Sequence, residues 1–423
     1  MMCINVPLDM ILFAVAATVH KESVMRRGAV LVAGIGLTAL IAGGAANLGN
    51  VDARASAAPA SCTIAALKRI KVGSQPVAMA ITPGGKKGYV ANANSSFVSP
   101  IRIGMNTPLK RVRFGAPGDG ADAVVVTPNG RYAYLAGVTT HTRGAFLRGR
   151  VLPIRTATDR PLPPIRAGHV LIGMTITPNG KTIYAMSWLG GPGSVIPIKT
   201  ATNKALQPIK AGRIDNEDSI TITPDGRTVY VTNFDSGTVT PIRTATNLAL
   251  KPIKVGRDPN QIAITPDGSM AYVTTVDGVR PIRLATNKAL RLIKMKNTPF
   301  AVAVTPDGRT AYVAALAPSS AARDTVTPIR VATNTALKPI TVGRGPDAIA
   351  VSPDGSTVFV ANRESNTITP IKTAGNTALN AVKVGKQPIA LAFTPGGRTL
   401  YVVDYTSDDG HGFVTPVRTC VTR

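Results

Sequence analysis

Acidic side chains gather at two places in the sequence, and hydrolytic or cation-binding chemistry could occur there. The two groups are Asp215, Glu217 and Asp218, and Asp404, Asp408, Asp409 and His411. No spacing within either group matches a pair of carboxylates set for acid–base catalysis. We therefore interpret both groups as solvated loop acids, with a hydrolytic or cation site as the alternative.

Residues that could hold a metal or a cofactor are scattered along the chain. His141, His169 and His411 are far apart, and no His-x-His, Cys-x-x-Cys or Gly-x-Ser-x-Gly pattern occurs. Metal and haem sites need clustered His, Cys or carboxylate ligands. Trp188 is the only tryptophan, which is too few for docking a quinone cofactor. We expect no metal and no cofactor, and we favour a noncatalytic protein over an enzyme.

Basic residues are in large excess, with 48 lysines and arginines against 22 aspartates and glutamates, for a net charge of +26. Many recur at fixed positions of a repeat, and six positions at the junctions between repeats are His169, Arg213, Arg257, Lys296, Arg344 and Lys386. A ring of cations attracts polyanions. We expect these six to bind an anionic polymer, either a cell-envelope polysaccharide, a teichoic-type polymer or a nucleic acid, or a membrane surface. Solvated cations that prevent edge-to-edge aggregation are the alternative.

A repeat must position these residues. The tetrapeptide [Thr/Ser]-Pro-[Asp/Asn/Gly]-Gly occurs eight times at intervals of 40 to 50 residues, with prolines at 83, 128, 178, 224, 266, 306, 353 and 395. In the copy 220–256, short strands are expected at 220–223, 228–232, 238–244 and 250–255, because β-branched residues alternate there between turn residues. A period in the forties with four strands is typical of a propeller blade. The sequence predicts an all-β propeller of eight four-stranded blades, with seven as the alternative.

The two ends of the repeat array predict how the ring closes. Residues 67–73 match the fourth strand of the other repeats, and the last repeat stops after its third strand. We expect the segment 61–73 to complete the blade formed by 391–419. Cys62 and Cys420 then fall in the same column of the repeat, and an exported chain would join them by a disulfide. Two free thiols are the alternative.

The first 57 residues differ in composition from the rest. Met25-Arg26-Arg27 precedes an uncharged stretch, 28–51, and Ala55-Ser56-Ala57 follows. This order is typical of a secretory signal with a small-residue cleavage site. We expect a leader over 1–57, with Met25 as a possible start, and a propeller over 61–423 that is exported to the cell envelope or the extracellular space. An uncleaved membrane anchor is the alternative.

Tyr230-Val231-Thr232-Asn233 spells the motif YVTN, and looser copies begin at Tyr89, Tyr272, Tyr312, Phe359 and Tyr401. The chain resembles the exported bacterial YVTN-repeat β-propellers, which share a fold with haem-d1 and quinoprotein propellers. That resemblance implies the fold but not one function, because the relatives include surface-layer components, a DNA-binding protein and, more distantly, lactonases. An acidic column of the familiar repeat is basic here in every copy, for example at Arg243. We expect a noncatalytic binding or scaffold protein, with a lactonase-like hydrolase and a purely structural surface protein as alternatives.

Overall fold

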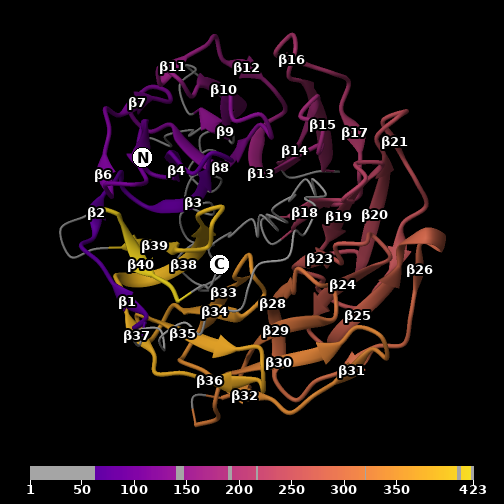
Figure 1. Cartoon of the computed structure of the whole chain (residues 1–423). Helices are drawn as coiled ribbons and strands as arrows, with labels where there is room; N and C mark the ends of the chain where they lie inside the picture. Colours follow the sequence, from indigo (N-terminus) through magenta and orange to yellow (C-terminus); the bar gives the residue numbers. More distant parts are fainter. Residues whose placement is uncertain are drawn as a thin grey trace, which may run out of the picture. The chain divides into compact units, whose positions relative to one another are not determined.

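In a computed structural model, eight antiparallel sheets follow one another around a ring (Figure 1). The structure describes residues 62–139, 147–188, 193–215, 218–319, 321–406 and 411–420. All of them belong to one compact unit, Val32–Arg423. The expected leader and its cleavage site lie outside the described residues. No helix in the described part is long and apolar enough to cross a membrane.

The first four blades each contain five strand segments. Blade 1 has β3 (Pro76–Ile81), β4 (Lys87–Asn92), β5 (Phe97–Arg102), β6 (Thr107–Pro108) and β7 (Val112–Arg113). Blade 2 has β8 (Gly120–Val126), β9 (Tyr132–Thr139), β10 (Arg148–Arg155), β11 (Arg160–Pro161) and β12 (Ile165–Arg166). Blade 3 has β13 (Val170–Ile176), β14 (Thr182–Trp188), β15 (Ser194–Lys199), β16 (Lys204–Ala205) and β17 (Ile209–Lys210). Blade 4 has β18 (Ile220–Ile222), β19 (Thr228–Asn233), β20 (Thr238–Arg243), β21 (Leu248–Ala249) and β22 (Ile253–Lys254).

The other four blades follow the same plan. Blade 5 has β23 (Ile262–Ile264), β24 (Met270–Thr275), β25 (Gly278–Arg283), the 3₁₀ turn η1 (Leu284–Thr286), β26 (Lys288–Ala289) and β27 (Ile293–Lys294). Blade 6 has β28 (Thr298–Val304), β29 (Thr310–Leu316), β30 (Thr325–Arg330), β31 (Thr335–Ala336) and β32 (Ile340–Thr341). Blade 7 has β33 (Pro346–Val351), β34 (Thr357–Asn362), β35 (Thr367–Lys372), β36 (Thr377–Ala378) and β37 (Val382–Lys383). Blade 8 has β38 (Lys386–Phe393), β39 (Thr399–Thr406) and β40 (Phe413–Arg418), with β1 (Ala65–Ala66) and β2 (Ile70–Lys71) from the N-terminal side.

The eight tetrapeptides close the turns between the first two strands of the blades. In blade 4, Gly226 has φ of +71°, which favours glycine, and Oδ1 of Asp225 accepts hydrogen bonds from Thr223 Oγ1 at 2.5 Å and from Arg227 N at 2.9 Å. The eight blades agree with the count of these turns.

The fourth strand of each blade is split into two pieces, where one continuous strand was expected. In blade 4, Ala249 pairs with Ile242 and Ile253 pairs with Val239. Pro241 lies between those two partners, and its carbonyl accepts a hydrogen bond from Leu250 N at 2.8 Å. Because proline has no N–H, it cannot return a bond to the fourth strand, and the ladder is interrupted there. Every third strand carries a proline at this position.

Neighbouring blades are joined by a repeated tyrosine contact. The Tyr230 hydroxyl donates a hydrogen bond of 2.6 Å to Oδ1 of Asn287 in the next blade, and Asn287 has φ of +50°. Asparagine tolerates that left-handed conformation better than most residues. Equivalent bonds join Tyr89 to Asp159, Tyr134 to Asn203, Tyr184 to Asn247, Tyr272 to Asn334, Tyr312 to Asn376 and Tyr401 to Asn106. We call these seven contacts the tyrosine latches.

The ring closes as expected from the chain ends. β1 and β2 pair with β40, with Ala66 opposite Val417 and Ile70 opposite Val414 (Figure 1). Cys62 and Cys420 form a disulfide with Cα atoms 5.6 Å apart. The eighth junction has no latch: blade 7 carries Phe359 in the tyrosine position, and Ile64 packs on the apolar cluster that contains it. At this junction the apolar contact of Ile64 stands in place of the hydrogen bond, and the disulfide joins the two chain ends within blade 8.

Candidate active site

The six cations expected at a ring mouth lie in or beside the connections between blades, and three of them carry ion pairs. Arg213 lies 3.3 Å from Asp235, Arg257 lies 2.6 Å from Asp277, and Arg344 lies 3.4 Å from Glu364. Each cation lies in the crossover that enters a blade. Its acidic partner lies in the hairpin between the second and third strands of that blade. These pairs place the hairpins and the crossovers on one face of the ring, which we call the crossover face. His169, Lys296 and Lys386 share that position in their blades.

Two acids singled out from the sequence are buried and hold loops in place. Oδ2 of Asp218 accepts a hydrogen bond of 2.7 Å from Asp215 N, and its Oδ1 accepts one of 2.7 Å from Phe234 N. Burial raises the pKa of Asp218 to about 8, although these bonds oppose the shift. Its oxygens accept two backbone hydrogen bonds and one of 3.4 Å from Thr232 Oγ1, so Asp218 is a structural carboxylate.

Asp404 occupies the position that asparagine holds in the YVTN motif. In blade 4 the Asn233 amide donates a hydrogen bond of 3.1 Å to Thr240 Oγ1, whereas in blade 8 Thr415 Oγ1 donates one of 2.5 Å to Asp404 Oδ2. Burial raises the pKa of Asp404 to about 7. Glu217, Asp408 and Asp409 lie outside the described residues, as does His141.

Two further acids, Asp122 and Asp347, lie at β-bulges in the first strands of blades 2 and 7. The register shifts between Ala121 and Ala123 in β8, and between Pro346 and Ala348 in β33, so each aspartate has no partner across the ladder. Bulges often redirect a side chain beside an active site. The bulged residue is apolar in four other blades: Val77, Ile172, Phe300 and Ile389.

The sequence analysis missed both acids. A signal was present, because Asp-[Ala/Ser]-[Val/Ile] occurs at 122–124, 218–220 and 347–349, at the start of three inner strands. A single aspartate ahead of an apolar strand has the appearance of a turn residue, and the bulge that withdraws it from the ladder depends on the partner strand.

Burial raises the pKa of Asp122 to about 7 and that of Asp347 to about 7. The guanidinium of Arg363 is close enough to Asp347 to act in the opposite direction. Oδ2 of Asp347 is buried and has no hydrogen-bond partner. An unpaired carboxylate oxygen of this kind is costly to maintain, which is a common property of functional sites.

The charges of Arg363 and Asp122 both act on Tyr405. Burial raises the pKa of its hydroxyl, the Arg363 charge lowers it, and Asp122 raises it. Asp122 from blade 2, Asp347 and Arg363 from blade 7, and Tyr405 from blade 8 therefore share one electrostatic environment. We call these four residues the acid–arginine cluster. Asp122 remains partly accessible to solvent, whereas Tyr405 is 6% exposed.

A carboxyl group with a pKa near 7 exchanges its proton close to neutral pH, which suits a general acid or base. An arginine beside it can stabilise a developing oxyanion, and a tyrosine hydroxyl can donate a hydrogen bond to the same oxygen. Together these groups suit the attack of water on an ester carbonyl. Among the described residues, no group of three or more His, Cys, Asp or Glu side chains could hold a metal ion.

Comparison with known proteins identifies one matching family and solved structures that have the same fold. Residues 173–415 match the family described as "Lactonase, 7-bladed beta-propeller". This segment runs from β13 to β40 and includes Asp347, Arg363 and Tyr405, whereas Asp122 precedes it. No curated protein matches the sequence.

Many solved structures share the fold, and two of them are compared with this chain below. Hydrazine synthase of Kuenenia stuttgartiensis has a TM-score of 0.56 at 18% identity, over 71% of this chain and 96% of that one. A putative 6-phosphogluconolactonase from Bacteroides uniformis has a TM-score of 0.53 at 16% identity, over 74% of this chain and 97% of that one. Because both sequence identities are below 20%, these similarities show a shared fold and not a shared function.

These findings confirm the β-propeller and correct the expected function. The expectation of a noncatalytic binding or scaffold protein is wrong, because the matching family is described as a lactonase family. The lactonase-like hydrolase that the sequence offered as an alternative agrees with that match. The matching model is not one of YVTN repeats, so that resemblance stays a prediction.

Proposed function

Because the chain belongs to the lactonase, 7-bladed β-propeller family, we propose that it hydrolyses a lactone at the acid–arginine cluster. The observation that carries this proposal is Oδ2 of Asp347, a buried carboxylate oxygen without a hydrogen-bond partner, on a residue within the field of Arg363. The ring has eight blades, one more than the family's description, and the three cluster residues in blades 7 and 8 lie within the matched segment.

In the proposed reaction, the Asp347 carboxylate takes a proton from a water molecule as the water oxygen attacks the lactone carbonyl carbon. The carbonyl oxygen becomes an oxyanion, which the Arg363 guanidinium and the Tyr405 hydroxyl stabilise. The carbon–oxygen bond of the ring then breaks, and the leaving alkoxide receives a proton from the carboxyl group of Asp347. The product is a hydroxy acid, which releases one proton to water at neutral pH. Asp122, whose charge acts on Tyr405, is a second carboxyl group that could take part in proton transfer.

The direct test is proton release from a panel of γ- and δ-lactones at constant pH, with the purified protein and with Asp347→Asn. We expect the variant to lose at least about 100-fold in kcat/KM, because a general base contributes on the order of 10²–10⁴ in rate. Glu364→Gln is the matched control, since it removes an exposed acid from the hairpin of the same blade. Absence of turnover on the whole panel by the unmodified protein, or full activity of Asp347→Asn, would contradict the proposal.

We further infer that the protein works outside the cytoplasm, as an exported YVTN-type propeller. The Cys62–Cys420 disulfide supports this location, because disulfides persist mainly in oxidising compartments. The signal-like segment 1–57 supports it as well. A fusion of residues 1–60 to a reporter enzyme that is active only after export tests the location, and a reporter that stays inactive would argue against it.

A further inference from the structure

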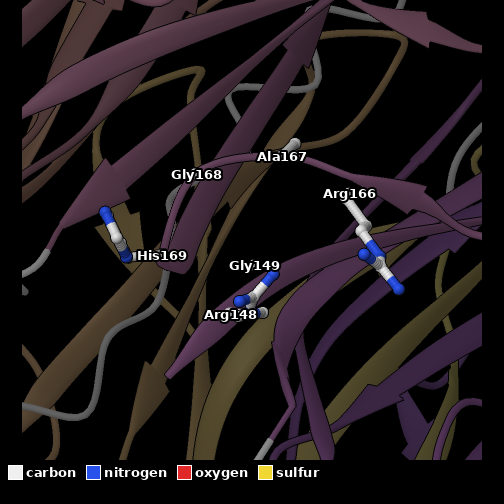
Figure 2. Close-up of a pocket in the computed structure, with 6 residues that line it drawn as sticks. All are labelled: Arg148, Gly149, Arg166, Ala167, Gly168 and His169. Atoms are coloured by element: carbon white, nitrogen blue, oxygen red, sulfur yellow. The ribbon is translucent and has the colours of Figure 1, made fainter. Parts of the chain in front are cut away.

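A pocket of about 370 Å³ lies on the crossover face where blade 2 passes to blade 3. Figure 2 shows the residues that line it: Arg148, Gly149, Arg166, Ala167, Gly168 and His169. Arg148 begins β10, Arg166 ends β12, and His169 follows in the crossover to β13. The side chain of Arg148 is drawn between those of His169 and Arg166 (Figure 2). Three basic side chains and no acidic one therefore line this pocket.

The pocket exists in this blade because its second and third strands are longer than usual. β9 and β10 have eight residues each, whereas β19 and β20 of blade 4 have six. The extra residues include the pair Thr139 and Arg148, and Thr139 Oγ1 donates a hydrogen bond of 3.1 Å to the Arg148 carbonyl. The longer hairpin brings Arg148 above the crossover.

Glycines allow the crossover to run close beneath that hairpin. A Cβ atom at Gly149 would lie 1.9 Å from the Ala167 carbonyl oxygen, and Gly168 has φ of +57°. Other side chains at these two positions would push the crossover away from β10 or strain its backbone. The pocket is thus built into the backbone of this junction.

The sequences of the two hairpins next to this junction contain no acidic residue. Three crossover cations in other blades pair with an acid of their hairpin, but the hairpin segments 138–149 and 187–193 contain no aspartate or glutamate. Between Asp122 and Asp215 the sequence has twelve lysines and arginines and a single acid, Asp159. That acid is engaged by Lys87, at 2.7 Å. The pocket therefore lies in a strongly positive part of the chain. The acid Asp119 lies 3.8 Å from Arg150, which is the ladder partner of Arg166.

We propose that this pocket binds the phosphate or sulfate group of a small molecule. Arginine presents paired N–H donors that match the oxygens of such groups, and three basic side chains balance a doubly charged anion better than a single carboxylate. The volume lies at the small end of ligand pockets, which suits a compact molecule. The site differs from the acid–arginine cluster in its residues, and it does not depend on lactone hydrolysis.

Trp188 provides the test. It is the only tryptophan, it pairs with Val170 across the sheet, and the neighbouring Ser187 Oγ accepts a hydrogen bond of 2.9 Å from His169 N. We would titrate the full chain with inorganic phosphate, glycerol 3-phosphate, sulfate and acetate at constant ionic strength and follow tryptophan fluorescence. We expect saturable changes with the first three and at least about tenfold weaker binding of acetate. Tighter binding of glycerol 3-phosphate than of inorganic phosphate would identify an organic phosphate as the ligand, and equal binding would identify the free oxyanion.

Two variants test whether phosphate binds in the pocket or is only attracted by the net positive charge of the protein. Arg148→Gln should raise the dissociation constant for phosphate at least about tenfold, because one charge-assisted hydrogen-bonding group is lost. Arg155→Gln removes the same charge from the other, exposed end of β10 and should leave the constant within about twofold. His169→Gln is a second variant in case Arg148→Gln fails to fold. Equal weakening by the Arg148 and Arg155 variants, or no saturable change with phosphate in the unmodified chain, would overturn the proposal.

Discussion

The hydroxyl of Tyr401 in blade 8 donates a hydrogen bond to Oδ1 of Asn106 in blade 1, across 295 residues of sequence. The same contact joins Tyr230 to Asn287 and recurs at five other junctions. The first and last blades are therefore held together by the same contact as six other adjacent pairs. The latch also explains two columns of the repeat at once, since the tyrosine of one blade and the asparagine of the next form one hydrogen bond.

The latches predict an asymmetric response to adding or removing one hydroxyl. Tyr272→Phe should lower the free energy of unfolding by about 1 kcal/mol, because Asn334 Oδ1 loses its donor. The reverse change, Phe359→Tyr, should give no gain, because the register of β1 puts the apolar Ile64 in the position of the acceptor in the following blade. Urea unfolding curves measure both changes. A gain in stability for Phe359→Tyr would contradict the pairing of these columns.

The disulfide predicts a large effect of reductant on stability. Cys62 and Cys420 are separated by 358 residues, so their bond restricts almost the whole unfolded ring. Replacing both by serine should lower the free energy of unfolding by about 3 kcal/mol. The measurement is denaturant unfolding with and without reductant, and the double serine variant should not respond to reductant. Equal midpoints for the reduced and oxidised protein would refute this role.

Asp347 predicts the pH dependence of lactone hydrolysis. A general base must be deprotonated, and burial raises the pKa of Asp347 to about 7. The value of kcat/KM should therefore rise with pH and level off above about 7. Arg363→Gln removes a charge that lowers this pKa, so the rising limb should move to higher pH as the maximal rate falls. A rising limb that stays in place in the variant would separate Arg363 from the base.

Asp404 predicts a pH-dependent gain in stability from one substitution. Its pKa in the folded state is raised to about 7, so the folded state binds more protons than the unfolded state between about pH 4 and 7. Stability contributed by this group is present at low pH and falls as pH rises through that range. Asp404→Asn restores the residue found in the YVTN motif and should stabilise the protein at pH 8 by on the order of 1–3 kcal/mol, with little gain at pH 4.

Melting temperatures of Asp404→Asn and of the unmodified chain from pH 4 to 8 measure this difference. Asp225→Asn is a control, because that carboxyl lies in a turn, where its pKa is lowered rather than raised. A gain for Asp404→Asn that is the same at pH 4 and pH 8 would show that the carboxylate charge is not the cause.

The ring could be predicted from local signals, because each turn depends on residues such as Pro224 and Gly226 that are adjacent in the sequence. The split fourth strand could not, since its cause is Pro241 on the facing strand. The acid–arginine cluster was missed for a similar reason. Asp122 and Tyr405 belong to opposite ends of the repeat array, and only closure of the ring brings them into one field. The sequence shows the crossover cations at fixed positions of the repeat. Their ion pairs with hairpin acids such as Asp277 could not be predicted, because the folded blade brings the crossover and the hairpin together.

The disulfide also determines how the molecule transmits force. Cys62 and Cys420 lie at the two ends of the described propeller, and the bond between them spans a Cα distance of 5.6 Å. When the two tails of the chain are pulled apart, tension passes through this covalent link, and the eight blades between the cysteines are bypassed. Stretching the oxidised protein from its ends would therefore leave the ring intact, whereas the reduced protein would unravel blade by blade.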